Sequence, residues 1–206
     1  MQFWNEAVVD RSWRVLIELQ KRYDFILIGG WAVYLLAHTS KSKGIDIIVD
    51  HDTLQKMRTE MVVKKSEHLR KYETARDDIS IDIYVPYYSK LTIDISELQK
   101  HVQSVEGFSI PSAEYLLLLK LDAEMSRADS IKGTKDRSDI LSLLISNAVD
   151  PAEFKAVISK YSSKVYRERL KEIVNKSTKE YEYLDIVNYR KIKLIKKKIV
   201  KEFDLG

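Results

Sequence analysis

Two short apolar segments each carry a single aspartate, and this feature restricts the possible folds more than any other in the sequence. Asp46 interrupts the apolar run from Ile45 to Val49, and Asp82 interrupts the run 79–85. Short apolar runs of this kind are typical of buried β-strands. A carboxylate in such a strand is unfavourable unless a cation or hydrogen-bond donors meet it. The sequence therefore predicts that both aspartates face a polar site.

The alternation of side chains along a strand indicates how the two carboxylates could meet. Asp46 shares its strand face with Gly44, and Asp82 shares its face with Ser80. If the two strands are neighbours in a sheet, the carboxylates can converge on one divalent cation. Mg²⁺ needs only one or two protein carboxylates when phosphate and water complete its coordination shell. This pattern therefore predicts a shared cation site.

A glycine pair lies between a strand-like segment and a helix-like segment. Residues 25–28 have the pattern of a short strand, residues 31–38 have that of a buried helix, and Gly29 and Gly30 join them. Glycines let the backbone approach a ligand closely, and the N–H groups at a helix start attract anions such as phosphate. A tight turn alone also explains such a pair.

The first half of the chain combines strand and helix patterns. We expect an amphipathic helix over residues 5–22, a short helix from Thr53 capped by Asp52, and a hairpin with arms at 71–75 and 79–85 that turns at Asp77-Asp78. From residue 111 the pattern becomes helical. Helices are expected from Ser112, over 135–146, 151–161 and 164–175, and from Tyr181 to Phe203. We therefore predict an α+β protein with an α/β domain at 1–110 and an α-helical domain at 111–206.

Composition excludes several classes of protein. Of the 206 residues, 45% are hydrophobic and 32% are charged, which fits neither a disordered chain nor a membrane protein. The absence of cysteine excludes disulfide scaffolds, thiolate zinc sites and cysteine nucleophiles. No signal-peptide pattern follows Met1, so we expect a cytoplasmic protein without membrane contact. The high content of lysine, isoleucine and glutamate favours a thermophilic source.

The net charge of +4 conceals a basic segment near the C-terminus. Residues 190–201 hold seven lysines and arginines and no acid, and the remaining 28 basic residues face 31 acidic ones. In a helix over this segment, Tyr189, Ile192, Ile195, Ile199 and Phe203 form an apolar stripe. We expect the lysines to project outward and to contact an RNA: Lys193, Lys196, Lys197 and Lys201. A solvated helix face gives the same charge count.

The order of these motifs resembles the nucleotidyltransferase fold of the polymerase-beta-like superfamily. The shared order is a strand, a Gly-Gly pair, a helix, a strand with an acid, and a later strand with an acid. Among known families the chain is similar to the small prokaryotic nucleotidyltransferases of the AbiEii-type toxin and minimal-nucleotidyltransferase groups. The resemblance rests on the segments 28–33, 43–49, 81–83, 118–121 and 135–140, with Arg127 and the pair Leu143-Leu144. It implies a mixed sheet with flanking helices, followed by a C-terminal α-helical bundle.

The resemblance also implies roles for individual residues. Asp46 and Asp82 would hold catalytic Mg²⁺ or Mn²⁺. Residues implied to contact the nucleoside triphosphate are Gly29, Gly30, Lys43, Lys120, Arg127 and Lys135. Asp136 and Asp139 would orient the basic side chains or the attacking group, and together with Lys120 they complete the implied catalytic set. The alternative is that four of them are solvated or salt-bridged surface side chains: Lys120, Arg127, Lys135 and Asp139.

One position departs from the family pattern. The family has an acid, an apolar residue and an acid on the first strand, whereas this chain has Gly44 in place of the first acid. Two cations about 3.5 to 4 Å apart need bridging carboxylates, so a missing ligand weakens the site. Three interpretations stay open: an enzyme with a substitute acid such as Asp50 or Asp78, a degenerate nucleotide-binding protein, or an inactivating change.

The function that the resemblance implies is transfer of a nucleoside monophosphate from a triphosphate to a hydroxyl group. The acceptor would be RNA, particularly tRNA, or a protein, and the enzyme could be a toxin with a dedicated antitoxin. The alternative is a catalytically impaired nucleotide- or RNA-binding protein of the same fold. A third possibility is a protein-interaction subunit that uses the helical half.

Overall fold

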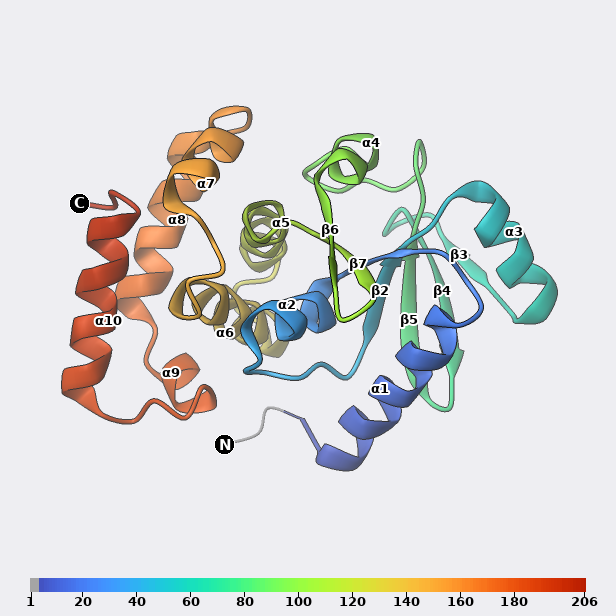
Figure 1. Cartoon of the computed structure of the whole chain (residues 1–206), viewed down its shortest axis with the longest axis horizontal. Helices are drawn as coiled ribbons and strands as arrows, with labels where there is room; N and C mark the ends of the chain where they lie inside the picture. Colours follow the sequence, from blue (N-terminus) through green and yellow to red (C-terminus); the bar gives the residue numbers. More distant parts are fainter. Residues whose placement is uncertain (1–3) are drawn as a thin grey trace. The chain divides into compact units, whose positions relative to one another are not determined.

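The computed structural model describes residues 4–206 and shows an α+β fold (Figure 1). One seven-stranded mixed sheet has the order β3-β4-β5-β2-β1-β7-β6. Its strands are β1 (Ile26–Ile28), β2 (Ile45–Ile48), β3 (Lys64–Ser66), β4 (Lys71–Arg76), β5 (Ile79–Tyr84), β6 (Val102–Val105) and β7 (Phe108–Pro111). The predicted fold class, a mixed sheet with flanking helices followed by a helical part, is confirmed.

The described residues form two compact units. The sheet unit contains Trp4–Leu35 and Lys41–Ser112, and the helical unit contains Leu36–Ser40 and Ala113–Gly206. Each unit has its own buried apolar residues, for example Leu27, Ile47 and Ile81 in the sheet unit.

Aromatic packing fixes the first two helices of the sheet unit. Helix α1 (Glu6–Gln20) buries Ser12, whose hydroxyl accepts a hydrogen bond from Trp31 Nε1 at 2.9 Å. Trp31 belongs to α2 (Gly29–Ala37), and its ring centroid lies 5.0 Å from that of Trp13 and 5.5 Å from that of Tyr34. Such aromatic pairs add to the gain from apolar burial. They hold the start of α2 in a defined position.

The hairpin and the short helix of the sheet unit follow local sequence signals. Asp77 and Asp78 both have positive φ, as a two-residue type I′ turn between β4 and β5 requires. Helix α3 (His51–Glu60) begins earlier than expected, because Asp50 is its N-cap and accepts a hydrogen bond from the backbone of Thr53. The prediction that Asp52 caps this helix was wrong: Asp52 lies within the first turn.

Two parts of the sheet were not predicted. β6 and β7 form a hairpin whose turn residues, Glu106 and Gly107, have positive φ. The dipeptide Glu106-Gly107 between two alternating segments is the signal that could have revealed it. β3 lies at the sheet edge and has no apolar residue, so its hydrophobic pattern gives no signal. The helix α4 (Ile95–Leu98) and a 3₁₀ turn at Gln99–His101 precede β6.

The helical unit contains α5 to α10. Their bounds are α5 (Ala113–Ser126), α6 (Ile131–Ile145), α7 (Pro151–Ser159), α8 (Ser163–Lys176), α9 (Lys179–Tyr183) and α10 (Tyr189–Glu202). In Figure 1, α8 and α10 run side by side. The single helix predicted from Tyr181 to Phe203 was wrong, because Asp185 has φ of +56° and Asn188 starts a new helix as its N-cap. Within residues 4–206, no helix is both long and apolar enough to cross a membrane.

Candidate active site

Three carboxylates lie in one row across neighbouring strands of the sheet unit. Asp46 of β2 pairs with Asp82 of β5 in the parallel register, and Asp82 pairs with Glu73 of β4 in the antiparallel register. Paired residues point to the same face of a sheet, and neighbouring strands are about 4.8 Å apart. The two predicted aspartates therefore share one face. Glu73 adds a third carboxylate that sequence analysis missed, because its strand partner is not visible in the sequence.

The carboxylate row lies on the less buried face of its strands. Ile79, Ile81 and Ile83 of β5 are 0 to 2% exposed, whereas the side chain of Asp82 between them is 22% exposed. Asp46 likewise is partly exposed between two buried isoleucines. A carboxylate in this position keeps access to solvent and to a ligand. Asp46 and Asp82 therefore both lie on the partly exposed face of the sheet, where the sequence predicts a polar site.

The start of α2 lies directly against Asp46. Ile28 pairs with Asp46 across β1 and β2, and Gly29 follows as the first residue of the helix. Gly29 has φ of +71°, and a Cβ atom there would lie 2.8 Å from Asp46 Cγ. Glycine is therefore required by the backbone and by the closeness of the carboxylate. Because the first N–H groups of a helix lack intrahelical partners, this end of α2 attracts anions.

Gly29→Ala should destabilise the protein, whereas Gly44→Ala should not. The alanine side chain would cost about 1–2 kcal/mol for the left-handed backbone alone, and it would also displace the Asp46 carboxylate. A Cβ atom at Gly44 meets no atom closer than the Ser80 carbonyl oxygen, at 3.8 Å. Denaturant unfolding followed by circular dichroism measures both changes. Equal stability of the two variants would contradict the described contact at Gly29.

Lys71 of β4 is a second residue that sequence analysis missed. Its Nζ lies 2.6 Å from Asp82 Oδ2 and 3.0 Å from Glu73 Oε1, and its side chain is 12% exposed. Burial lowers the pKa of this ammonium group, but hydrogen bonds and attraction from Asp82 and Glu73 outweigh burial and leave the pKa raised. Lys71 is therefore a charged part of the carboxylate row.

Neither acid proposed as a substitute at Gly44 can reach the row. Asp50 lies four residues after Asp46, past the end of β2, and Asp78 lies four residues before Asp82, ahead of the start of β5. Because β2 and β5 are parallel, the two acids lie in opposite directions from the row, each at roughly 13 Å for an extended chain. Asp50 caps α3, and Asp78 lies 3.6 Å from an arginine of α1. The hypothesis of a substitute acid at these positions was therefore wrong.

The helical unit contains a buried cluster made of the predicted basic and acidic residues. Lys120 Nζ lies 3.1 Å from Asp136 Oδ1 and 2.7 Å from Asp139 Oδ2, the latter without an aligned hydrogen bond. Lys135 also donates to Asp139, and Arg127 Nε donates to Asp136 at 2.7 Å. Arg127 is the residue that follows the end of α5, and it contacts the same Asp136 carboxylate as Lys120 of α5.

The members of this cluster differ in how far their side chains are exposed to solvent. The side chains of Lys120, Lys135, Asp136 and Asp139 are 0 to 9% exposed, whereas that of Arg127 is 39% exposed. Burial lowers the pKa of Lys135, and attraction to Lys120 and Arg127 outweighs burial and lowers the pKa of Asp136. The alternative of solvated or salt-bridged surface side chains is confirmed for the ion pairs of Lys120, Lys135 and Asp139 but wrong for their exposure, because all three are buried. The role of the cluster in neutralising phosphate charge stays a prediction.

Lys43 of the sheet unit lies beside an aromatic ring. It is exposed, and its Nζ lies 4.8 Å from the centroid of the Trp4 ring.

The lysines of α10 differ in their surroundings. Lys196 does not project outward as predicted: its Nζ donates to the carbonyl oxygens of Asn175 and Ser177 at 2.7 and 2.9 Å. Lys193, Lys197 and Lys201 are exposed on α10. Tyr189 is 77% exposed, so it does not belong to the buried apolar stripe, which contains Ile199.

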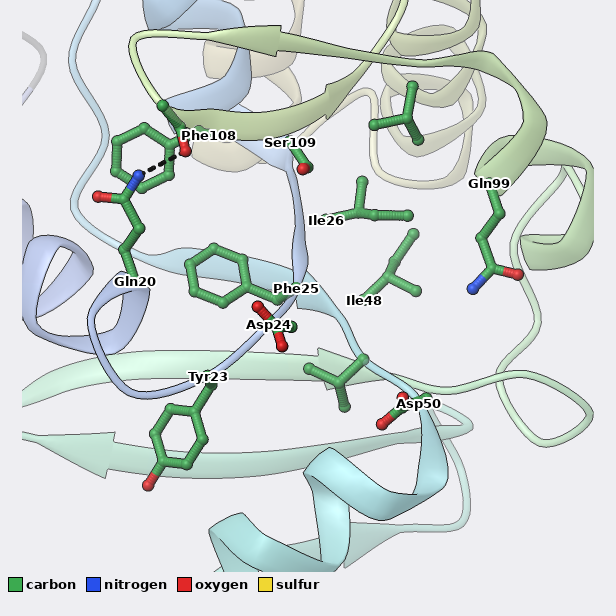
Figure 2. Close-up of a pocket in the computed structure, with 13 residues that line it drawn as sticks. Gln20, Tyr23, Asp24, Phe25, Ile26, Ile48, Asp50, Gln99, Phe108 and Ser109 are labelled. Atoms are coloured by element: carbon green, nitrogen blue, oxygen red, sulfur yellow. Dashed lines mark hydrogen bonds between the residues drawn. The ribbon is translucent and has the colours of Figure 1, made fainter.

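A cavity of about 430 Å³ lies at the opposite ends of β1 and β2 from Asp46. Figure 2 shows its lining, with Ile26 and Ile48 on the two strands and Asp50 beyond β2. Gln20 Nε2 donates to the Gly107 carbonyl at 2.7 Å, which joins the end of α1 to the β6–β7 turn. No residue of the carboxylate row lines this cavity. The two features are separate.

The described residues contain no group of three or more histidine, aspartate or glutamate side chains arranged to hold a metal ion. The donor set of the row is nevertheless of the kind that Mg²⁺ and Mn²⁺ prefer, because it consists of carboxylate oxygens. Two carboxylates in register beside a helix N-terminus fit a cation that also binds phosphate. A metal site at Asp46 and Asp82 stays a prediction.

The α+β fold, with its mixed sheet and its helical second unit, is shared with solved structures. The structure is similar to that of JHP933 from Helicobacter pylori, with a TM-score of 0.55 and 14% identity over 97% of this chain and 94% of that chain. It is also similar to ANT(2")-Ia in complex with adenylyl-2"-tobramycin, with a TM-score of 0.53 and 15% identity over 76% of this chain and 98% of that one. At these identities the comparison establishes the fold.

Other comparisons add little. An antigenic nucleotidyltransferase-like protein from Paracoccidioides brasiliensis aligns with a TM-score of 0.44 and 15% identity, over 87% of this chain and 92% of that chain. No protein-family model matches the sequence. No curated protein matches it either.

Proposed function

We propose that this chain is a metal-dependent nucleotidyltransferase that moves a nucleoside monophosphate from a nucleoside triphosphate to a hydroxyl group. The observation that carries the proposal is the register of Asp46 and Asp82 beside the N-terminus of α2. This arrangement combines oxygen ligands for Mg²⁺ or Mn²⁺ with N–H groups suited to phosphate. The fold shared with ANT(2")-Ia, whose structure contains adenylyl-2"-tobramycin, supports the proposal.

The proposed reaction needs positioning and charge neutralisation more than covalent chemistry by the protein. The acceptor hydroxyl oxygen bonds to the α-phosphorus and its proton passes to solvent water. The bond from that phosphorus to the bridging oxygen breaks, and pyrophosphate leaves. A bound divalent cation would neutralise charge on the phosphates. Asp46 and Asp82 would hold this cation, and the start of α2 would bind phosphate oxygens. Gly29 permits that close approach because it has no side chain.

The acceptor belongs to the same proposal. We infer an RNA, particularly tRNA, or a protein hydroxyl, as in an AbiEii-type toxin with an antitoxin partner. The exposed lysines of α10, at positions 193, 197 and 201, support an RNA contact because they lie one or two helical turns apart.

A second candidate function is nucleotide binding with impaired catalysis. Two observations favour it: position 44 has no carboxylate, and Asp82 is already paired with Lys71. A protein of this kind would bind the triphosphate and release it unchanged.

Labelled transfer assays separate the two candidates. The protein is incubated with each α-labelled triphosphate, Mg²⁺, total RNA and cell protein, and the Gly44→Asp variant is tested beside it. The open space at Gly44 accepts a side chain, so stability should stay nearly unchanged. Gly44→Asp is expected to raise transfer at least about tenfold by adding a metal ligand, whereas the isosteric Gly44→Asn should not. Triphosphate binding without transfer in all three forms would establish the second candidate.

A further inference from the structure

The ammonium group of Lys71 lies where a cation would bridge two carboxylates of the row. Lys71 is diagonal to Asp82 across the β4–β5 pair, and Glu73 is the direct partner of Asp82. The Nζ atom contacts both carboxylates, at 2.6 and 3.0 Å. With 12% exposure, the Lys71 side chain is held against the sheet instead of extending into solvent. The position between Asp82 and Glu73 is therefore already occupied by a positive charge.

We propose that Lys71 is a built-in cation that replaces a divalent ion between Asp82 and Glu73, so that the row binds a single divalent ion on the Asp46 side. This inference rests on the proposed function, because it takes Asp46 and Asp82 as metal ligands. The charges agree with it: Asp46, Asp82 and Glu73 carry −3 together, and Lys71 reduces this to −2, which one divalent ion balances. A second divalent ion would have to displace the ammonium group or be repelled by it.

The proposal also explains how the chain could function with Gly44. Two-metal sites use bridging carboxylates to hold two cations about 3.5 to 4 Å apart. This chain lacks a carboxylate at position 44 and has Lys71 at the other side of Asp82, so it has fewer ligands and one permanent cation. The two differences are complementary, because a site that holds one divalent ion needs fewer carboxylates.

Titration with Mn²⁺ alone, followed by electron paramagnetic resonance on the full chain without nucleotide, tests this proposal. Lys71→Met should increase the affinity for Mn²⁺ at least about tenfold, because it removes the competing charge. Lys71→Arg should keep the affinity of the natural protein. Lys65→Met is the matched control, because Lys65 is the neighbouring exposed lysine on β3 and pairs with Glu67 outside the row.

A double variant shows whether the gain comes from the carboxylate row. Adding Asp82→Asn to Lys71→Met should abolish the increased Mn²⁺ affinity. An unchanged affinity in Lys71→Met, or a gain that persists in the double variant, would overturn the proposal. Lys71→Gln, with the same expected gain, replaces Lys71→Met if thermal unfolding shows that the methionine variant does not fold.

The Mn²⁺ readout is independent of nucleotidyl transfer. If Lys71→Met gains affinity and no triphosphate is bound or transferred, Lys71 acts as the built-in cation and the proposed function fails. If the triphosphate is transferred and Lys71→Met gains nothing, the proposed function stands and the role of Lys71 fails.

Discussion

Asp46→Asn is expected to reduce nucleotidyl transfer by at least about 10²-fold, comparable to the loss of one preorganised electrostatic group in an active site. Asp46 is in register with Asp82 and lies against the first residue of α2, so its carboxylate is the point where cation and phosphate would meet. Asparagine has nearly the same shape but cannot neutralise a cation. The loss should therefore appear in the rate, with folding retained, and steady-state transfer of the labelled nucleotide measures it.

Asp50→Asn is the matched control for this prediction. Asp50 follows the same strand but caps α3 about 13 Å of strand away from Asp46. Asparagine is also a good N-cap, so the variant should keep both stability and transfer. If Asp46→Asn and Asp50→Asn transferred the nucleotide equally well, Asp46 would have no part in the reaction.

Glu124→Ala is expected to lower the free energy of unfolding of the helical unit by about 3–5 kcal/mol, the range for removing one partner of a buried ion pair. Glu124 of α5 is fully buried and contacts two arginines. Its carboxylate accepts from Arg137 of α6 at 3.0 Å and from two nitrogens of Arg169 of α8 at 2.7 Å. The hydrogen bonds to Glu124 raise the pKa of the Arg169 guanidinium group. For Arg137, burial lowers the pKa, but hydrogen bonds to Glu180 and Glu124 outweigh burial and leave the pKa raised. Removing the carboxylate would leave both charges poorly compensated.

Glu172→Ala provides the comparison for Glu124. Glu172 also pairs with Arg169, at 2.6 Å, but its side chain is 38% exposed. An exposed pair contributes less than about 1 kcal/mol, so this variant should change stability little. Denaturant unfolding at neutral pH, followed by circular dichroism, measures both variants. A loss for Glu124→Ala no larger than that for Glu172→Ala would show that the three helices do not depend on this carboxylate.

The sequence was sufficient to predict the elements that carry strong local signals. Short apolar runs predicted the strands that carry Asp46 and Asp82, the turn at Asp77-Asp78 predicted the hairpin, and the pair Gly29-Gly30 indicated the change from strand to helix. Each of these signals depends on residues close together in the chain. The order of strand, glycine pair, helix and acid-bearing strands could therefore be predicted before the strand pairing was known.

The features that were missed depend on pairing between distant residues. Lys71 and Glu73 belong to the carboxylate row only because β4 pairs with β5 in one register. Lys196 has the sequence environment of an exposed lysine, yet it donates to carbonyl groups at the end of α8. The break between α9 and α10 depends on a left-handed Asp185, which a helical pattern of apolar residues does not reveal.

Equilibrium binding of the four nucleoside triphosphates tests the central claim, that the row beside α2 is a metal and nucleotide site. Calorimetric titration with Mg²⁺ present compares the natural protein with a variant that combines Asp46→Asn and Asp82→Asn. We predict that at least one triphosphate binds, and that its affinity falls at least about tenfold, or 1.4 kcal/mol, in the double variant and on removal of Mg²⁺. Binding of equal strength in the double variant, or no binding of any triphosphate to the natural protein, would contradict the claim.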